Sequence, residues 1–165
     1  MLEKLAWTTT IGHRWKCAVF RALLEVAARH RLPVVIHCRG YGSSEADKDC
    51  LDILREVLPS YPIHFHCFSA PIEHFKLLSS SFPNSIFGLT KKFPSSSWLS
   101  ELLSLLSLRR VVFESDAPFL SPSPFHLHPI AVSIANEVDC HPHQVLMATA
   151  FTALCFYSHC TPSTM

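Results

Sequence analysis

The segment "VVIHCR" (residues 34–39) is an apolar run that ends abruptly in a His, a Cys and an Arg. The same arrangement occurs in "IHFHCFS" (residues 63–69), whereas "VVFESDAP" (residues 111–118) ends in carboxylates. Short, continuous apolar runs are typical of strands that are buried on both faces of a parallel sheet. These segments therefore predict strands whose carboxyl ends bring polar residues to one edge of a sheet.

Helical patterns alternate with the predicted strands along the rest of the chain. Residues 14–30 have an apolar face that carries Trp15, Val19, Leu23 and Val26, and Pro33 ends this helix. One more strand is expected at residues 85–89, and the further helices at residues 44–58, 71–78, 98–106, 130–138 and 142–157. This alternation predicts an α/β fold with a parallel sheet, formed by residues 1–165 as a single domain.

Composition excludes several classes of protein. The 14 basic and 13 acidic residues leave a net charge of +1, so any nucleic-acid binding needs a local basic patch. The 7 Cys include no CxxC pair, which argues against a small zinc module. No apolar run reaches the ~20 residues of a membrane span, and the N-terminus lacks a signal-peptide pattern. We therefore expect an intracellular protein, cytoplasmic or nuclear, without a membrane partner.

Three potential metal ligands stand at the ends of predicted strands. His37 ends the first strand, His66 ends the second, and Asp116 follows the last. Imidazole and carboxylate together suit zinc or manganese, whereas magnesium prefers more oxygen ligands. A single His at a strand end is more often structural, with its ring bonded to a backbone carbonyl. Three such groups at one sheet edge instead indicate a metal site.

Four segments in this order resemble the TatD family of metal-dependent deoxyribonucleases: "LPVVIHCR", "HFHCFS", "FPNSIFGLT" and "VVFESDAPFLSP". The family's segments read roughly PVVIHxR, HCFSG, GxT and ETDAPYLxP, and the likeness extends over about residues 14–157. Cys38 and the "FPN" are similar to the larger animal TatD-domain proteins. The resemblance implies a TIM-barrel-like fold and a divalent metal, Mg, Mn or Zn. It also implies 3′-to-5′ exonuclease hydrolysis of phosphodiester bonds in DNA, with RNA as a possible substrate. By the same resemblance His37, His66 and Asp116 are metal ligands, and Asp116 also activates the attacking water.

Two motifs of the family are absent from this sequence. Family members begin with a strand that ends in His-x-His, and a later strand carries a Glu within a GEIGLD-like segment. We therefore expect a partial barrel, N-terminally incomplete and lacking the first strands, since a whole barrel takes at least ~200 residues. The alternative to a nuclease is a non-catalytic remnant of the fold that acts as a binding or interaction module.

Further residues are candidates for supporting roles at this edge. Glu114 is either a buried acid beside the metal or a structural partner of Arg39. His64 shares a strand face with His66 and is either packed structurally or part of the surroundings of the metal. Lys91 and Lys92 follow a strand, where they would contact a DNA phosphate or form a solvated pair.

Overall fold

The computed structural model describes residues 10–38 and 45–158. Its elements alternate along the chain as the sequence predicts, and a short 3-10 turn precedes the last strand. They are α1 (Thr10–His30), β1 (Val34–Ile36), α2 (Glu45–Val57), β2 (Ile63–Phe65), α3 (Ile72–Ser81), β3 (Ile86–Leu89), α4 (Ser96–Leu105), η2 (Leu108–Arg110), β4 (Val111–Phe113), α5 (His128–Glu137) and α6 (Pro142–Ser158).

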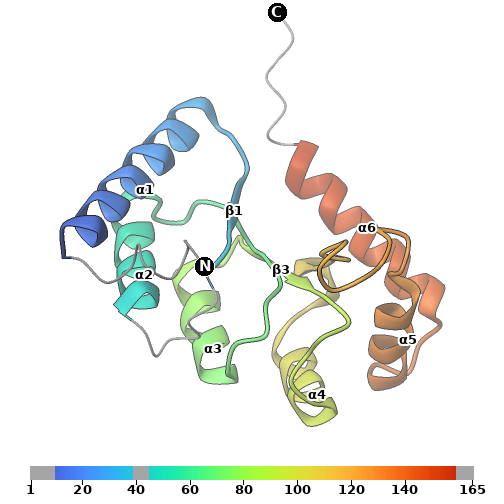
Figure 1. The fold of residues 1–165 in the computed structure, drawn as a ribbon. Helices are drawn as coiled ribbons and strands as arrows, with labels where there is room; N and C mark the ends of the chain where they lie inside the picture. Colours follow the sequence, from blue (N-terminus) through green and yellow to red (C-terminus); the bar gives the residue numbers. More distant parts are fainter. Residues whose placement is uncertain (1–9, 39–44, 159–165) are drawn as a thin grey trace, which may run out of the picture.

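The four strands lie in the sheet in the order in which they occur in the sequence, and each pairs in parallel with the next. The helices form an arc around this sheet (Figure 1). Consecutive parallel strands with helical crossovers are the repeating unit of a (β/α) barrel, which closes with eight strands. The predicted fold class, a partial TIM-like barrel, is thus confirmed for the described residues. None of the helices in this part of the chain has the length and hydropathy that crossing a bilayer demands.

Helix boundaries follow local capping signals. Helix α4 begins at Ser96, two residues before the predicted start, because the hydroxyl of Ser95 accepts a hydrogen bond of 3.1 Å from the backbone N–H of Trp98. Helix α3 begins after Pro71, which lacks a backbone N–H and is well suited to a helix start. These signals explain why the predicted and observed bounds differ by only a few residues.

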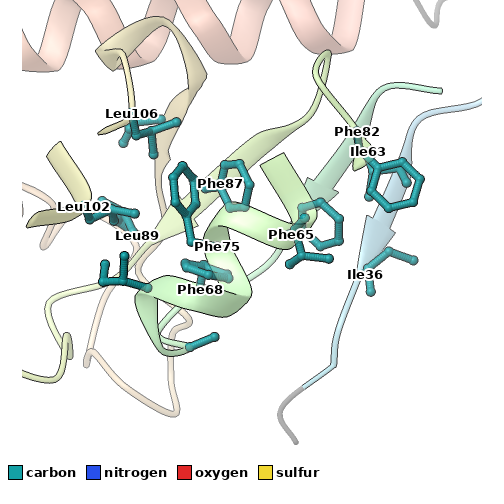
Figure 2. Close-up of a cluster of buried hydrophobic side chains, with 14 of the residues drawn as sticks. Ile36, Ile63, Phe65, Phe68, Phe75, Phe82, Phe87, Leu89, Leu102 and Leu106 are labelled. Carbon is teal, nitrogen blue, oxygen red and sulfur yellow. The ribbon is translucent and has the colours of Figure 1, made fainter. Parts of the chain in front are cut away.

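One face of the sheet is apolar and carries the hydrophobic core. The strand register aligns Ile36 with Phe65 and Phe65 with Phe87 across three strands. Figure 2 shows these side chains packed with Phe75 of α3 and with Phe82, whose side chain is fully buried. The ring centroids of Phe87 lie 5.4 Å from Phe65 and 4.9 Å from Phe75. This packing anchors the strands to their helices and fixes the positions of the strand ends.

The opposite face of the sheet carries the residues that alternate with the core. Its row includes His64, Gly88 and Val112, which the register places on neighbouring strands. Phe156 of α6 packs against Ile86 and Val112 on this face. Helix α6 therefore covers part of the face from which the polar residues project.

The apolar face of α1 is exposed in the described part of the chain. Trp15 is 69% exposed, Val19 55%, Leu23 63% and Val26 45%. The helix packs onto α2 through a different side, where Leu24 is buried. The sequence thus identifies the apolar face correctly, but no described element covers it.

Arg110 ties the last strand to the neighbouring helix and loop. Its guanidinium donates hydrogen bonds to the carbonyl of Ser85 (2.8 Å), the hydroxyl of Ser79 (2.8 Å) and the carbonyl of Phe82 (3.2 Å). It also lies over the ring of Phe87, 5.5 Å from the centroid. Ser85 and Phe82 are buried. The carbonyl of Phe82 also accepts a hydrogen bond of 3.1 Å from the backbone N–H of Ser85, so it is the carbonyl of Ser85 that relies on Arg110 for a donor.

The Arg110→Met variant is expected to lower the free energy of unfolding by about 1–3 kcal/mol, since it leaves the buried carbonyl of Ser85 without its donor and removes the hydrogen bond to Ser79. Urea denaturation measures this difference. Arg109→Met is the matched control, because Arg109 is the exposed neighbour of Arg110, and its effect should stay within about 0.5 kcal/mol. Equal losses in the two variants would contradict the anchoring role.

Candidate metal centre

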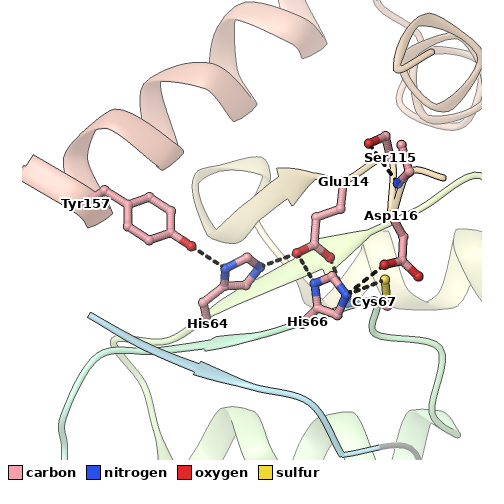
Figure 3. A network of polar contacts seen from close by, with 8 residues as sticks. His64, His66, Cys67, Glu114, Ser115, Asp116 and Tyr157 are labelled. Atoms are coloured by element: carbon pink, nitrogen blue, oxygen red, sulfur yellow. Dashed lines mark hydrogen bonds and ion pairs between the residues drawn. The ribbon is translucent and has the colours of Figure 1, made fainter. Parts of the chain in front are cut away.

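The polar residues that follow the strands meet at one edge of the sheet. His37 follows β1, His66 follows β2, and Asp116 lies three residues beyond β4. The ring centroids of His37 and His66 are 4.0 Å apart. Nε2 of His66 lies 3.4 Å from Oδ1 of Asp116, and Figure 3 shows the two side chains facing one another. The structure thus places His66 beside both His37 and Asp116 at this edge, with a close donor-atom distance between His66 and Asp116. That the three residues are metal ligands stays a prediction.

Glu114 fixes the orientation of the His66 ring. Its Oε1 lies 2.6 Å from Nδ1 of His66, and its Oε2 accepts a hydrogen bond of 2.7 Å from the backbone N–H of Cys67. Burial raises the pKa of Glu114, but the contact with His64, the Cys67 N–H and the charge of His66 together lower it below the ordinary value. The carboxylate is therefore ionised at neutral pH and acts as an acceptor.

The ionised Glu114 also determines the tautomer of His66. A carboxylate that only accepts requires the proton of the ring to be on Nδ1. Nε2 then carries a lone pair, and this atom is the one that faces Asp116. A His that donates one ring N–H to a carboxylate and offers its other nitrogen is the common arrangement of a metal-bound His.

The donor atoms at this edge suit a divalent cation. Two ligand bonds of about 2.0–2.2 Å place their donor atoms about 3–3.6 Å apart, and the 3.4 Å between Nε2 of His66 and Oδ1 of Asp116 agrees with this. Sγ of Cys67 lies 3.0 Å from the same Nε2. Nitrogen and oxygen donors together suit zinc or manganese, and a sulfur donor in the set would favour zinc.

The backbone at two of these residues is in the left-handed region. Cys67 has φ of 48° and Asp116 has φ of 45°. For a residue other than Gly, this conformation costs about 1–2 kcal/mol of free energy. Such residues cluster at functional sites, where the surrounding structure holds them in place. The hydrogen bond from the Cys67 N–H to Glu114 is one such restraint.

His64 is buried behind Glu114 and connects it to α6. Its Nδ1 lies 2.7 Å from the hydroxyl of Tyr157. Its Nε2 lies 3.1 Å from Oε1 of Glu114 without being aligned for a hydrogen bond. His64 therefore lies between Tyr157 and Glu114, and its contact is with Glu114. Arg39, the other partner considered for Glu114, lies outside the described residues.

Sequence reasoning missed two residues of the centre, Cys67 and Gly88. A Cβ on Gly88 would lie 1.9 Å from Oε2 of Glu114 and 2.7 Å from Nε2 of His64, so glycine is required for these side chains to cross the strand. A Gly within an apolar strand is the signal for such a close approach. For Cys67, the signal is its position directly after His66.

The two lysines after β3 differ in their surroundings. Both are exposed, but only Lys92 lines a hollow of about 450 Å³. Cys67, Ser69 and Thr90 also line this hollow, which therefore adjoins the metal centre. Lys91 is not among its lining residues. Of the two lysines, Lys92 therefore lies at the hollow beside the candidate centre.

Known proteins share both the sequence and the fold of this chain. The sequence profile of the family described as "TatD related DNase" matches residues 6–149. The chain is 38% identical over 118 residues to the human 3′-5′ RNA nuclease TATDN2, covering 70% of this chain and 15% of that protein. It is 34% identical over 128 residues to a 3′-5′ ssDNA/RNA exonuclease TatD from a Pantoea species, covering 76% of this chain and 46% of the relative.

A crystal structure gives the same result at the level of the fold. The hydrolase TatD family protein from Entamoeba histolytica superimposes with a TM-score of 0.72 at 12% identity, covering 92% of this chain and 58% of that one. The part of the chain that aligns corresponds to less than half of the length of each of the two sequence relatives, 15% and 46%. Because the family profile extends over most of its residues, the chain belongs to the TatD family.

Proposed function

We propose that this chain supplies part of the ligand set, including His66 and Asp116, of a metal-dependent nuclease centre. This centre would hydrolyse phosphodiester bonds from the 3′ end of DNA or RNA. The observation that carries the proposal is the 3.4 Å separation between Nε2 of His66 and Oδ1 of Asp116 at the carboxyl edge of a parallel sheet. The names of the relatives, an RNA nuclease and an ssDNA/RNA exonuclease, support both classes of nucleic acid as substrate.

Each residue of the centre has a separate task in this proposal. His37, His66 and Asp116 hold the divalent cation. The cation supplies positive charge beside the phosphate and makes hydroxide available near neutral pH. Asp116 orients the attacking water and accepts its proton, a role that a carboxylate at a half-buried position can fill. Glu114 keeps the proton of His66 on Nδ1 and so keeps Nε2 free to bind.

The hollow beside the centre is the proposed place for the terminal nucleotide. Lys92 enters this hollow from the loop after β3 and would pair with a phosphate. Thr90 lines the same hollow and adds a hydroxyl that can donate to a phosphate or sugar oxygen. Such a substrate also agrees with the intracellular, cytoplasmic or nuclear, location that the sequence predicts.

The proposal is tested by hydrolysis of a labelled single strand of DNA and of RNA. We expect slow release of nucleotides from the 3′ end that requires a divalent cation, supplied in turn as zinc, manganese or magnesium. The release should be slow because this sequence shows neither the family's opening His-x-His strand nor its GEIGLD-like Glu. The Asp116→Asn variant should lower the rate at least about 100-fold by removing the proton acceptor. Asp139→Asn is the matched control, because Asp139 is exposed and shares a left-handed backbone, with φ of 48°.

Other outcomes would reject the nuclease role. Equal rates for the wild type and Asp116→Asn would show that Asp116 is not the acceptor. Binding of the labelled strand without any hydrolysis, with manganese bound, would instead favour the non-catalytic binding module. Filter binding of the same strand, measured in parallel, separates these two results.

A further inference from the structure

A second group of metal-binding side chains lies between the first two helices, in the layer outside the sheet. His13 and Cys17 are four residues apart on α1 and so project from the same face of the helix. Asp49 on α2 faces them, and the donor atoms of the three side chains all lie within 4.8 Å of one another. Helices α1 and α2 lie side by side (Figure 1), and neither carries a residue of the strand-end centre.

The contact between His13 and Asp49 is close but is not a hydrogen bond. Nε2 of His13 lies 2.7 Å from Oδ2 of Asp49. Oδ2 is buried, and yet it accepts no hydrogen bond from any described residue. A buried carboxylate oxygen without a donor is costly, and a shared cation would remove that cost.

A hollow of about 90 Å³ lies at this group, lined by its three members and by Lys16 and Cys50 among others. Its volume exceeds that of a single ion, so the side chains have room to close around one. A hydrogen bond with Cys38 and burial raise the pKa of Cys50, which therefore remains a thiol and does not join the ligands. Cys17 has no such contact with another thiol among the described residues.

We infer that His13, Cys17 and Asp49 form a second site, for a soft divalent cation of the zinc and cobalt class. Imidazole, thiolate and carboxylate are the three ligand types that zinc takes in proteins. Calcium and magnesium would prefer a set made of oxygen alone. The ion joins two residues of α1 to one of α2, so its role is to fix α1 onto the rest of the fold.

Cobalt is the probe for the site, because a cobalt–thiolate bond gives a charge-transfer absorption that nitrogen and oxygen ligands do not give. Titration of the whole chain with Co²⁺ should produce this band. The Cys17→Ser variant should lower the intensity of this band by about half or more. Any absorption that remains should come from Cys67 at the strand-end centre. The same variant should lower the affinity for zinc at least about 100-fold. Cys155→Ser, a half-buried Cys of α6, is the matched control and should leave the band unchanged.

Asp49→Asn and His66→Ala separate the two sites. Asp49→Asn conserves shape and should lower zinc affinity at the helical site at least about tenfold, whereas His66→Ala should not change the cobalt signal that depends on Cys17. Zinc should also raise the melting temperature of the wild type but not of Cys17→Ser. An unchanged cobalt band in Cys17→Ser, in a protein whose circular dichroism shows that it is folded, would overturn the inference. So would a zinc affinity that Asp49→Asn does not alter.

Discussion

Titration of Mn²⁺ into the His66→Ala variant is expected to give no measurable binding at the strand-end centre. His66 is the proposed ligand whose position the structure determines best, because Glu114 holds its Nδ1 at 2.6 Å and leaves Nε2 directed at Asp116. This sequence shows neither the family's opening His-x-His strand nor its GEIGLD-like Glu, so the described residues offer candidate ligands from one side only. Loss of one member from so small a set should lower the affinity more than 100-fold, beyond the 10–100-fold typical of supporting residues.

Calorimetry on the wild type and two further variants makes this result specific. His126→Ala is the matched control, since His126 is exposed in the loop before α5 and should bind Mn²⁺ as the wild type does. Glu114→Gln should give an intermediate loss of about 10–100-fold, because the amide can no longer fix the tautomer of His66. Manganese is used because the thiolate of the helical site favours zinc. Equal affinities for the wild type and His66→Ala would place the metal elsewhere.

The meeting of His66 and Asp116 could be predicted from the sequence because it follows from a general property of parallel sheets. Strands that run in the same direction end at the same edge, so residues 66 and 116 approach although 50 positions separate them. The alternation of residues along a strand similarly places His64 and His66 on one face. For Glu114 the sequence left two roles open, a buried acid beside the metal or a structural partner of Arg39. Its contacts with His66 and Cys67 favour the first role.

Other features depend on register and on atomic distances that no sequence pattern contains. The role of Gly88 arises because the register pairs it with Val112, which places the side chain of Glu114 across the glycine. The contact of Cys67 with His66 depends on the left-handed backbone at Cys67. The exposed face of α1 could not be read from its apolar pattern, since periodicity identifies a face but not its partner.

The Gly88→Ala variant, which adds one methyl group, is expected to disrupt the centre without removing any ligand. The new Cβ would lie 1.9 Å from Oε2 and 2.3 Å from Cδ of Glu114, far inside contact distance, so the carboxylate must move. His66 then loses the partner that orients its ring. We expect Mn²⁺ affinity to fall about 10–100-fold and the free energy of unfolding to fall by about 1–3 kcal/mol, measured by calorimetry and urea denaturation.

A double variant distinguishes displacement of Glu114 from general damage to strand β3. Glu114→Ala alone should also weaken Mn²⁺ binding and destabilise the fold, because Nδ1 of His66 and the Cys67 N–H lose their acceptor. Once this side chain is absent, the close neighbour that remains is Nε2 of His64 at 2.7 Å, and the imidazole can move into the vacated space. Gly88→Ala/Glu114→Ala should therefore be about as stable as Glu114→Ala alone. Such non-additivity is the mark of two residues in contact. If the two losses of stability simply add, the methyl group must act on some other neighbour in the strand, and Gly88 is not what positions the acid that holds His66.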